Sequence, residues 1–217
     1  PDALPMLGCQ CPKALGLYKH RPELRPEGSA ARQAVFSNGT QVGLLAQQRH
    51  PGGVDCTPEH HYDFGPALEA TQGAMAAGAP VIYEAAFLHD GVLAAMDILV
   101  RDGDGWQAIE VKSSTEVKAP FVEDAALQYH VITGSGVRLH AMHLLVIDTS
   151  YVRRGALDVQ RLFRMEELTA VVRAKQREVA ARIAELKAVV QQPEEPVVGI
   201  GAQCNAPYAC DFLAHCW

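Results

Sequence analysis

"VLAAMDILVRDGDGWQAIEVK" occupies residues 92–112 and consists of two apolar runs separated by "RDGDG". Gly and Asp between two runs rich in apolar and β-branched residues are a strong signal for a β-hairpin. With a two-residue turn at Gly103-Asp104, the register of the hairpin places Asp97 directly opposite Glu110. The stretch therefore predicts two adjacent core strands, with a carboxylate on each at the same level.

The acidic residues of this hairpin need a cation. Glu110 and Lys112 are alternate residues of one strand, so their side chains share a face. Carboxylates directly opposite each other repel, and burying them is costly unless something pairs with them. One solution is a buried ion pair with Lys112. The other is a hard divalent metal ion bound by oxygen ligands, and it also accounts for the second acid.

The rest of the chain predicts an α/β fold with a mixed central β-sheet flanked by helices. Besides the hairpin, apolar periodicity and Gly or Pro boundaries predict strands over 80–91 and 139–150. Helices are expected over 31–50 with a break at Asn38-Gly39, and over 66–78, 123–136 and 164–192. Residues 1–25 are rich in proline and read as irregular. We expect an N-terminal segment over 1–30, a core over 31–192 and a cysteine-rich tail over 193–217.

Composition limits the class of protein. The chain has 217 residues and a net charge of −6, with 48% hydrophobic residues, which is ordinary for a globular protein. No apolar run reaches the roughly 18–20 residues that cross a membrane, so we expect a cytoplasmic protein without a membrane partner. Between residues 153 and 182 arginines and lysines are frequent. A solvated helix face explains them more simply than a nucleic-acid contact does.

The order of polar residues resembles a known superfamily. Asp97 on one strand, Glu110-Val111-Lys112 on the next and Gln128-Tyr129 on a helix resemble the RecB-type branch of the PD-(D/E)XK nucleases. Glu84 lies where that branch often has a further acid, and the chain resembles an uncharacterised bacterial family of RecB-like domains. The resemblance implies a metal-dependent deoxyribonuclease that uses Mg²⁺ or Mn²⁺. Its substrate would be DNA, as single strands or at ends.

The same resemblance assigns roles to the residues. Asp97, Glu110 and the carbonyl of Val111 would bind the metal ion, and Lys112 would orient the attacking water or stabilise charge on the phosphate. Gln128 would position the lysine, the water or a phosphate, and Glu84 would be a further catalytic acid.

One ligand of the wider branch is missing. Many RecB-type nucleases carry a metal-binding histidine four residues after a glycine on the first helix, but here Gly39 is followed at that distance by Gly43. Glu84 or a loop histidine (His50, His60 or His61) could compensate. The gap supports an alternative function: a catalytically weakened nucleic-acid-binding or redox-responsive module.

The cysteines form a second pattern. Cys204, Cys210 and Cys216 recur with five residues between each pair, and Cys11 lies far upstream. Six cysteines allow disulfides, and the tight pairs typical of structural zinc are absent. One remote and three clustered thiolates suit an iron–sulfur cluster.

The cysteine pattern is similar to that of CRISPR-associated iron–sulfur exonucleases of the RecB branch. The resemblance implies a four-iron, four-sulfur cluster held by the cysteines at positions 11, 204, 210 and 216, which clasps the tail to the N-terminal segment. Cys9 is the alternative to Cys11, and Cys56 is expected to lie outside the site.

Overall fold

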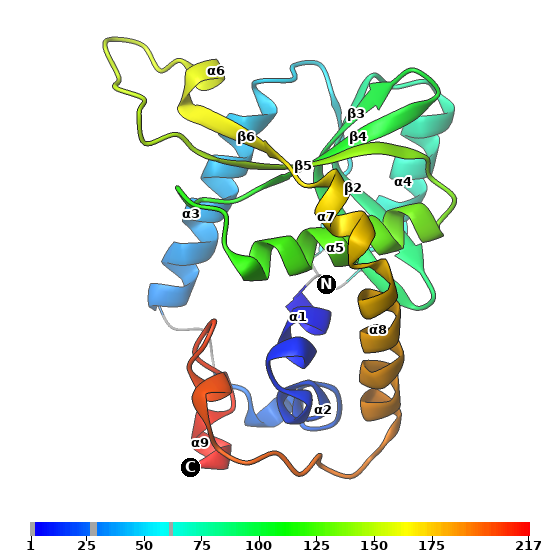
Figure 1. The fold of residues 1–217 in the computed structure, drawn as a ribbon, viewed down its shortest axis with the longest axis vertical. Helices are drawn as coiled ribbons and strands as arrows, with labels where there is room; N and C mark the ends of the chain where they lie inside the picture. The colour runs from blue at the N-terminus through cyan, green and yellow to red at the C-terminus, as the bar shows by residue number, and fades with distance from the viewer. Residues whose placement is uncertain (1–2, 27–29, 61–62) are drawn as a thin grey trace. The chain divides into compact units, whose positions relative to one another are not determined.

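The structure is a computed structural model, and it describes residues 3–26, 30–60 and 63–217. Contacts between Cα atoms divide the chain into two compact units. One unit is Ala31–Gln176, and the other joins Asp2–Ala30 to Arg177–Trp217 (Figure 1). The sequence analysis places the second boundary after residue 192, whereas this grouping assigns the preceding helix to the tail.

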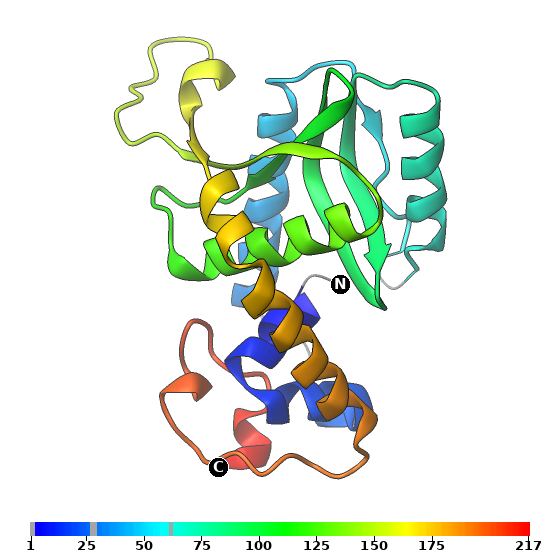
Figure 2. The same ribbon diagram turned by 45° about the vertical axis from the view of Figure 1, so that its right-hand side comes forward.

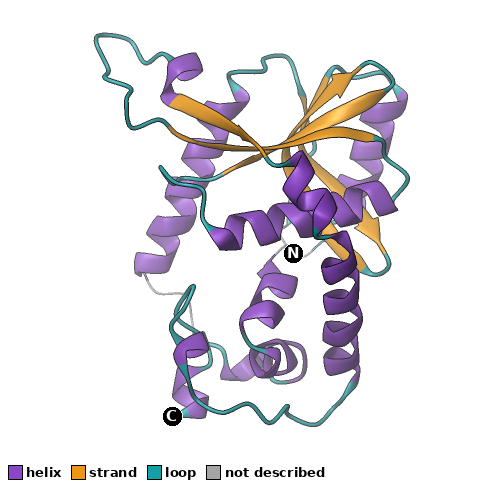
Figure 3. Cartoon of the chain, viewed as in Figure 1, coloured by secondary structure: helices purple, strands orange, loops and turns teal. Residues whose placement is uncertain are grey.

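The first unit contains a sheet and its covering helices (Figure 3). Its elements are α3 (Ala30–Gln47), β1 (Val54–Asp55), α4 (Gly65–Ala76), β2 (Val81–His89), β3 (Val92–Asp102), β4 (Gly105–Val111), α5 (Ala119–Gly134), β5 (Leu139–Ile147), α6 (Val159–Leu162), β6 (Phe163–Glu167) and α7 (Thr169–Ala174). The six strands lie in sequence order from β1 to β6. β1 is parallel to β2 and β4 to β5, and the other neighbours are antiparallel. The predicted mixed sheet flanked by helices is confirmed.

The hairpin register is also confirmed. Asp102 pairs with Gly105 and Leu99 with Ala108, so Gly103 and Asp104 form the turn. Gly103 has a φ of 57°, a left-handed conformation that glycine adopts without steric cost. The paired residues of the two strands extend to Ile98 and Ile109, which are the sequence neighbours of Asp97 and Glu110.

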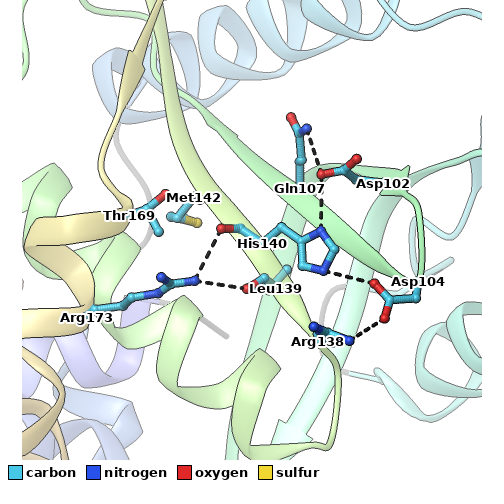
Figure 4. A network of polar contacts seen from close by, with 9 residues as sticks. All are labelled: Asp102, Asp104, Gln107, Arg138, Leu139, His140, Met142, Thr169 and Arg173. Atoms are coloured by element: carbon cyan, nitrogen blue, oxygen red, sulfur yellow. Dashed lines mark hydrogen bonds and ion pairs between the residues drawn. The ribbon is translucent and has the colours of Figure 1, made fainter.

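A polar network fastens the turn of this hairpin to β5 (Figure 4). The ring nitrogens of His140 lie 3.2 Å from Asp102 Oδ2 and 3.3 Å from Asp104 Oδ1. Gln107 Nε2 donates to Asp102 Oδ2 over 3.2 Å, and Arg138 pairs with Asp104. These contacts lie at the start of β4, whereas Lys112 follows its other end. They fix the hairpin turn and so the pairing of β3 with β4.

The same figure shows how α7 is attached to β5. The Arg173 guanidinium donates to the carbonyl oxygens of Leu139 (3.4 Å) and His140 (3.3 Å). At the start of α7, the backbone amide of Met142 in β5 donates to Thr169 Oγ1 over 3.0 Å.

The two faces of the sheet bury different helices. One face, with Tyr83, Ile98, Ile109 and Leu145, packs against Ala46 of α3. The opposite face is covered by α5, as Figures 1 and 2 both show. Because side chains alternate along a strand, Glu110 and Lys112 point away from the α3 face and toward α5.

The second unit is helical. Its elements are α1 (Ala3–Gln10), α2 (Pro12–His20), η1 (Pro22–Leu24), α8 (Gln176–Gln191), η2 (Ala202–Cys204) and α9 (Leu213–Cys216). Cys11, Ala14 and Leu17 pack with Phe212 in a small buried cluster. The tail therefore contributes a core side chain as well as cysteines. Across the described helices of both units, none is long and apolar enough to span a bilayer.

Two secondary-structure predictions were wrong in this part of the chain. Residues 1–25 are not irregular, since α1, α2 and η1 occupy most of them. Pro12 and Pro22 each lie in the first turn of a helix, where the missing amide hydrogen is not needed. Residues 164–192 are not one helix either. Their first part is β6, because pairing with β5 outweighs local helix preference.

The predicted break at Asn38-Gly39 is also wrong. α3 continues through both residues from Ala30 to Gln47. Glycine in a helix interior costs only about 1 kcal/mol, which the packing of the rest of a helix can offset.

Candidate functional site

Three acidic side chains meet where β2, β3 and β4 lie side by side. Continued one pair beyond Ile98 and Ile109, the hairpin register carries Asp97 opposite Glu110, and the Val111 amide donates to Asp97 Oδ2 over 2.6 Å. On the other side of β3, Tyr83 of β2 pairs with Ile98 and Ala85 pairs with Met96. Glu84 lies between Tyr83 and Ala85, so it is placed beside Asp97. The structure therefore brings the predicted acids of three strands to one level of the sheet.

Glu84 has an unusual backbone. Its φ is 52°, inside a strand that otherwise runs regularly from Val81 to His89. A non-glycine residue with positive φ is uncommon, and such strain concentrates at functional sites. The distortion is confined to the one residue of β2 that faces Asp97.

Crowding of negative charge changes how these acids titrate. Burial, with Glu110 and Asp55 nearby, raises the pKa of Glu84 to about 7. Burial, with Glu110 and Glu84 nearby, raises the pKa of Asp97 well above its ordinary value. Asp55 ends β1, next to Tyr83 in the register, and sequence reasoning missed it. A cation bound among these carboxylates would offset both the cost of burying their charges and their mutual repulsion.

A ring of polar contacts, closed through the backbone of α5, joins the end of β4 to that helix. Lys112 Nζ donates to Glu110 Oε1 over 2.7 Å and to Asp124 Oδ2 over 2.6 Å. Gln128 Nε2 donates to Glu110 Oε2 over 2.8 Å and, more weakly, to the Ala95 carbonyl over 3.4 Å. Gln128 thus contacts Glu110, and not Lys112. Each carboxylate oxygen of Glu110 has one partner in this ring.

The charge state of the ring follows from its geometry. Burial by itself would lower the pKa of Lys112, but the Glu110 and Asp124 carboxylates outweigh it and raise that pKa. Burial and Glu110 raise the pKa of Asp124, while the Lys112 ammonium opposes the rise. Lys112 is therefore a permanent cation at neutral pH.

Asp124 is the residue that sequence reasoning missed in this ring. It precedes Gln128 by one helical turn, so both side chains lie on the same face of α5. That spacing is the signal that could have found it. Two buried acceptor atoms, Asp124 Oδ1 and Gln128 Oε1, have no hydrogen-bond partner within the described residues.

The donor set suits a hard divalent cation. Asp97, Glu110 and Glu84 supply carboxylate oxygens, the ligands that Mg²⁺ and Mn²⁺ prefer. Across residues 3–26, 30–60 and 63–217, no three His, Cys, Asp or Glu side chains already stand at metal-binding distance. Binding would therefore need Glu110 to turn from Lys112 toward the ion. The Val111 carbonyl stays a predicted ligand.

The loop histidines give little support for a replacement ligand. Burial and Arg49 lower the pKa of His50, which keeps its ring in the neutral form that binds metals, but His50 belongs to no group of three or more candidate ligands among the described residues. His60 is described and exposed, and His61 lies outside the described residues.

The second unit gathers the predicted cysteines. Cys11, Cys204, Cys210 and Cys216 line one pocket, together with apolar side chains such as Leu17 and Phe212. Burial and the nearby thiolates of the other three raise the pKa of Cys210. The four sulfur atoms thus belong to one pocket.

The two remaining cysteines differ from these four. Cys9 is exposed, and Cys56 is buried in the other unit, where burial raises its pKa. Neither lines the pocket. The described cysteines form no disulfide. The structure thus places Cys11, and not Cys9, with the three tail cysteines.

Polar contacts hold the tail around the pocket. Gln10 Nε2 donates to the carbonyl oxygens of Gln203 (2.7 Å) and Tyr208 (2.6 Å). Lys13 Nζ pairs with Glu195 over 2.6 Å, and contact with Glu195 and Cys216 raises the pKa of Lys13.

The four thiols are donors that bind thiophilic metal groups. Thiolates around one zinc ion would stand about 3.8 Å apart, given a Zn–S bond of about 2.3 Å. The described residues contain no such tight group of three or more ligands, although the four cysteines line one pocket. The donor chemistry is that of iron–sulfur sites.

Comparisons with known proteins give distant likenesses. No protein-family model matches the chain, and no curated protein matches it significantly. The crystal structure of SSO0001 superposes with a TM-score of 0.45 and 14% identity, covering 98% of this chain and 84% of that one. An alkaline exonuclease, LHK-Exo from Laribacter hongkongensis, gives a TM-score of 0.34 and 18% identity over 80% and 88% of the two chains.

Proposed function

We propose that this chain is a metal-dependent nuclease of the PD-(D/E)XK type that hydrolyses DNA phosphodiester bonds, on single strands or at ends. One observation carries the proposal. The carboxylates of Asp97 and Glu110 and the ammonium of Lys112 meet where the middle of β3 lies beside the end of β4, under a helix that contributes Gln128. Buried acids with raised pKa values and one fixed cation are typical of a catalytic site.

The residues of the site have separate tasks. Asp97 and Glu110 would hold Mg²⁺ or Mn²⁺, which when bound polarises the phosphate and lowers the pKa of the attacking water. Lys112 keeps a positive charge where negative charge develops on the phosphate. Gln128 fixes the orientation of Glu110 through its 2.8 Å hydrogen bond. The Val111 amide does the same for Asp97.

We also propose a four-iron, four-sulfur cluster on Cys11, Cys204, Cys210 and Cys216. The shared pocket supports it, and so does the raised pKa of Cys210, to which the other three cysteines contribute. Bound there, the cluster would tie the tail to α2 and stabilise the second unit. Iron and sulfide per chain, measured on protein purified without oxygen, test this assignment against a single zinc ion.

Cleavage of end-labelled DNA tests the nuclease assignment. Wild type should degrade single-stranded DNA, or duplex from its ends, with Mg²⁺ or Mn²⁺, and chelation should stop it. Glu110→Ala should lose activity at least about 10³-fold because both ligand and ring partner disappear. The control is Glu116→Gln, an exposed acid on the loop after β4 that should keep wild-type activity. Labelled RNA in parallel reports the sugar preference.

The missing histidine of the family pattern gives the alternative its place in this test. A catalytically weakened binding module would bind DNA with divalent ions present but leave every labelled strand intact. If wild-type protein binds single- and double-stranded DNA without cutting either in the presence of Mg²⁺ or Mn²⁺, the nuclease assignment is wrong and the binding module takes its place.

A further inference from the structure

Lys112 has two carboxylate partners, and they come from different elements. Glu110 is two residues away on the same strand, whereas Asp124 lies on α5. A metal ion bound by Glu110 would compete with Lys112 for the same carboxylate. Asp124 is the partner that the ion does not need.

Asp124 is placed to hold the Lys112 ammonium. It is 9% exposed, and within the described residues its side chain bonds to Lys112 over 2.6 Å through Oδ2 while Oδ1 has no hydrogen-bond partner. A buried carboxylate is costly without a partner, so its position on α5 is stable only while the lysine stays beside it. The adjacent Glu123 differs, since it pairs with Lys175 over 2.6 Å on the outer side of the helix.

The mobility of lysine explains why a second anchor matters. A lysine side chain has four flexible bonds and carries about 2 kcal/mol of rotamer entropy when unrestrained. If Glu110 turned to the ion without another anchor, the ammonium would leave its place beside the water and the phosphate. Misplacing a catalytic group by about 1 Å can cost roughly 100-fold in rate.

We propose that Asp124 is a positioning residue that holds the Lys112 ammonium in the site while Glu110 binds the divalent ion. The proposal rests on the nuclease function inferred above, and it adds a residue to that site. Asp124 touches neither the ion nor the substrate. It acts through Lys112, and the one-turn spacing to Gln128 lets α5 anchor both Glu110 of β4 and Lys112, which follows that strand.

The kinetic test compares two neighbouring acids. Asp124→Asn removes the charge but keeps an oxygen acceptor, and it should lower kcat about 10- to 100-fold with little change in KM or in DNA affinity. Glu123→Gln makes the same change of charge one residue away and should keep the wild-type kcat. Asp124→Glu, which restores the carboxylate, should recover part of the loss and replaces the Asn variant if that one fails to fold.

A structural test does not depend on activity. Crystals of wild type and Asp124→Asn, each with Ca²⁺, would show where Lys112 lies when an ion occupies the carboxylates. We expect Lys112 Nζ to stay on Asp124 in wild type and to move away in the Asn variant. A wild-type structure with Lys112 detached from Asp124 would overturn the proposal even if the protein cut no DNA.

The outcomes separate the two proposals. If wild type cuts DNA and Asp124→Asn retains the wild-type kcat, the positioning role is wrong and the nuclease stands. If Asp124→Asn lowers kcat and raises KM together with a large fall in melting temperature, Asp124 has a structural role only. Inactive wild type refutes the nuclease, and the Ca²⁺ structures then decide the lysine contact alone.

Discussion

The polar site of the first unit draws its catalytic side chains mainly from one hairpin and the helix that follows it, whereas the cysteine pocket joins Cys11 to a tail that begins far downstream. The first site lies on strands whose neighbouring side chains, such as Leu99 and Ile109, are fully buried. The second lies over a small cluster of Cys11, Ala14, Leu17 and Phe212. A polar side chain removed from the first should therefore change chemistry, and one removed from the second should change folding.

The largest expected effect is on the pocket. Cys204→Ser should abolish bound iron and unfold the second unit, because the binding energy of a structural metal site, on the order of 10 kcal/mol, is folding energy. Iron per chain and proteolysis within residues 177–217 measure it. Cys9→Ser, at an exposed position outside the pocket, is the matched control. Full iron content in Cys204→Ser would break the comparison.

The next effect concerns the sheet. Lys112→Met should reduce cleavage about 10³-fold, or roughly 4 kcal/mol of the barrier, because the fixed charge beside the phosphate is lost. The melting temperature should fall even with saturating Mg²⁺, since the ion neutralises Glu110 but Asp124 loses its buried partner. A variant that cuts DNA at the wild-type rate would remove Lys112 from the catalytic residues.

Packing in the second unit comes third. Phe212 is 1% exposed, so Phe212→Ala should destabilise that unit by about 3–5 kcal/mol. Trp217→Ala removes an aromatic side chain that is 76% exposed in the same tail and should have little effect. Chemical unfolding of iron-loaded protein measures both. Equal and small losses would mean that coordination alone holds the tail.

The smallest effect is a pH dependence. With its pKa raised to about 7, Glu84 is protonated in weakly acidic solution and cannot bind an ion. Apparent Mg²⁺ affinity should therefore rise about tenfold per pH unit below 7 and level off above it. Calorimetric titrations at several pH values measure this, and Glu84→Gln should flatten the curve. A wild-type affinity independent of pH would exclude Glu84 as a ligand.

The same shift has a consequence for the metal-free protein. A carboxyl whose pKa is higher in the folded state binds more protons there than in the unfolded chain. The contribution of Glu84 to stability is therefore full below about pH 4.5 and is lost as the pH rises through about 7. Mg²⁺ should remove this loss, which thermal unfolding with and without the ion would show.

Sequence was sufficient for the hairpin and its carboxylates because both follow from local rules. Two-residue side-chain periodicity and the chemistry of the turn fixed the opposition of Asp97 and Glu110, and the register agrees. Nothing in its own segment marks Asp55, and the one-turn spacing from Asp124 to Gln128 does not by itself show that Asp124 contacts Lys112. Each matters through a residue on another element, Glu84 for one and Lys112 for the other.

The errors in secondary structure share one cause. The segment that forms β6 has exposed charged residues and helix-forming neighbours, and only the edge of β5 makes it a strand. α1 and α2 form despite their prolines because each helix accommodates proline in its first turn. Local preference decided these predictions, and tertiary contacts or position within the turn decided the structure.

The division of the chain also sets an order of events during synthesis. Ala31–Gln176 is one uninterrupted stretch, while the other unit needs segments from before and after it. Domains generally fold as units while the chain emerges from the ribosome. The sheet can be complete before Cys204 has been made, and the pocket cannot. With the proposed cluster, a cell short of iron would produce chains whose sheet is folded and whose second unit is unfolded. Proteases would degrade these chains.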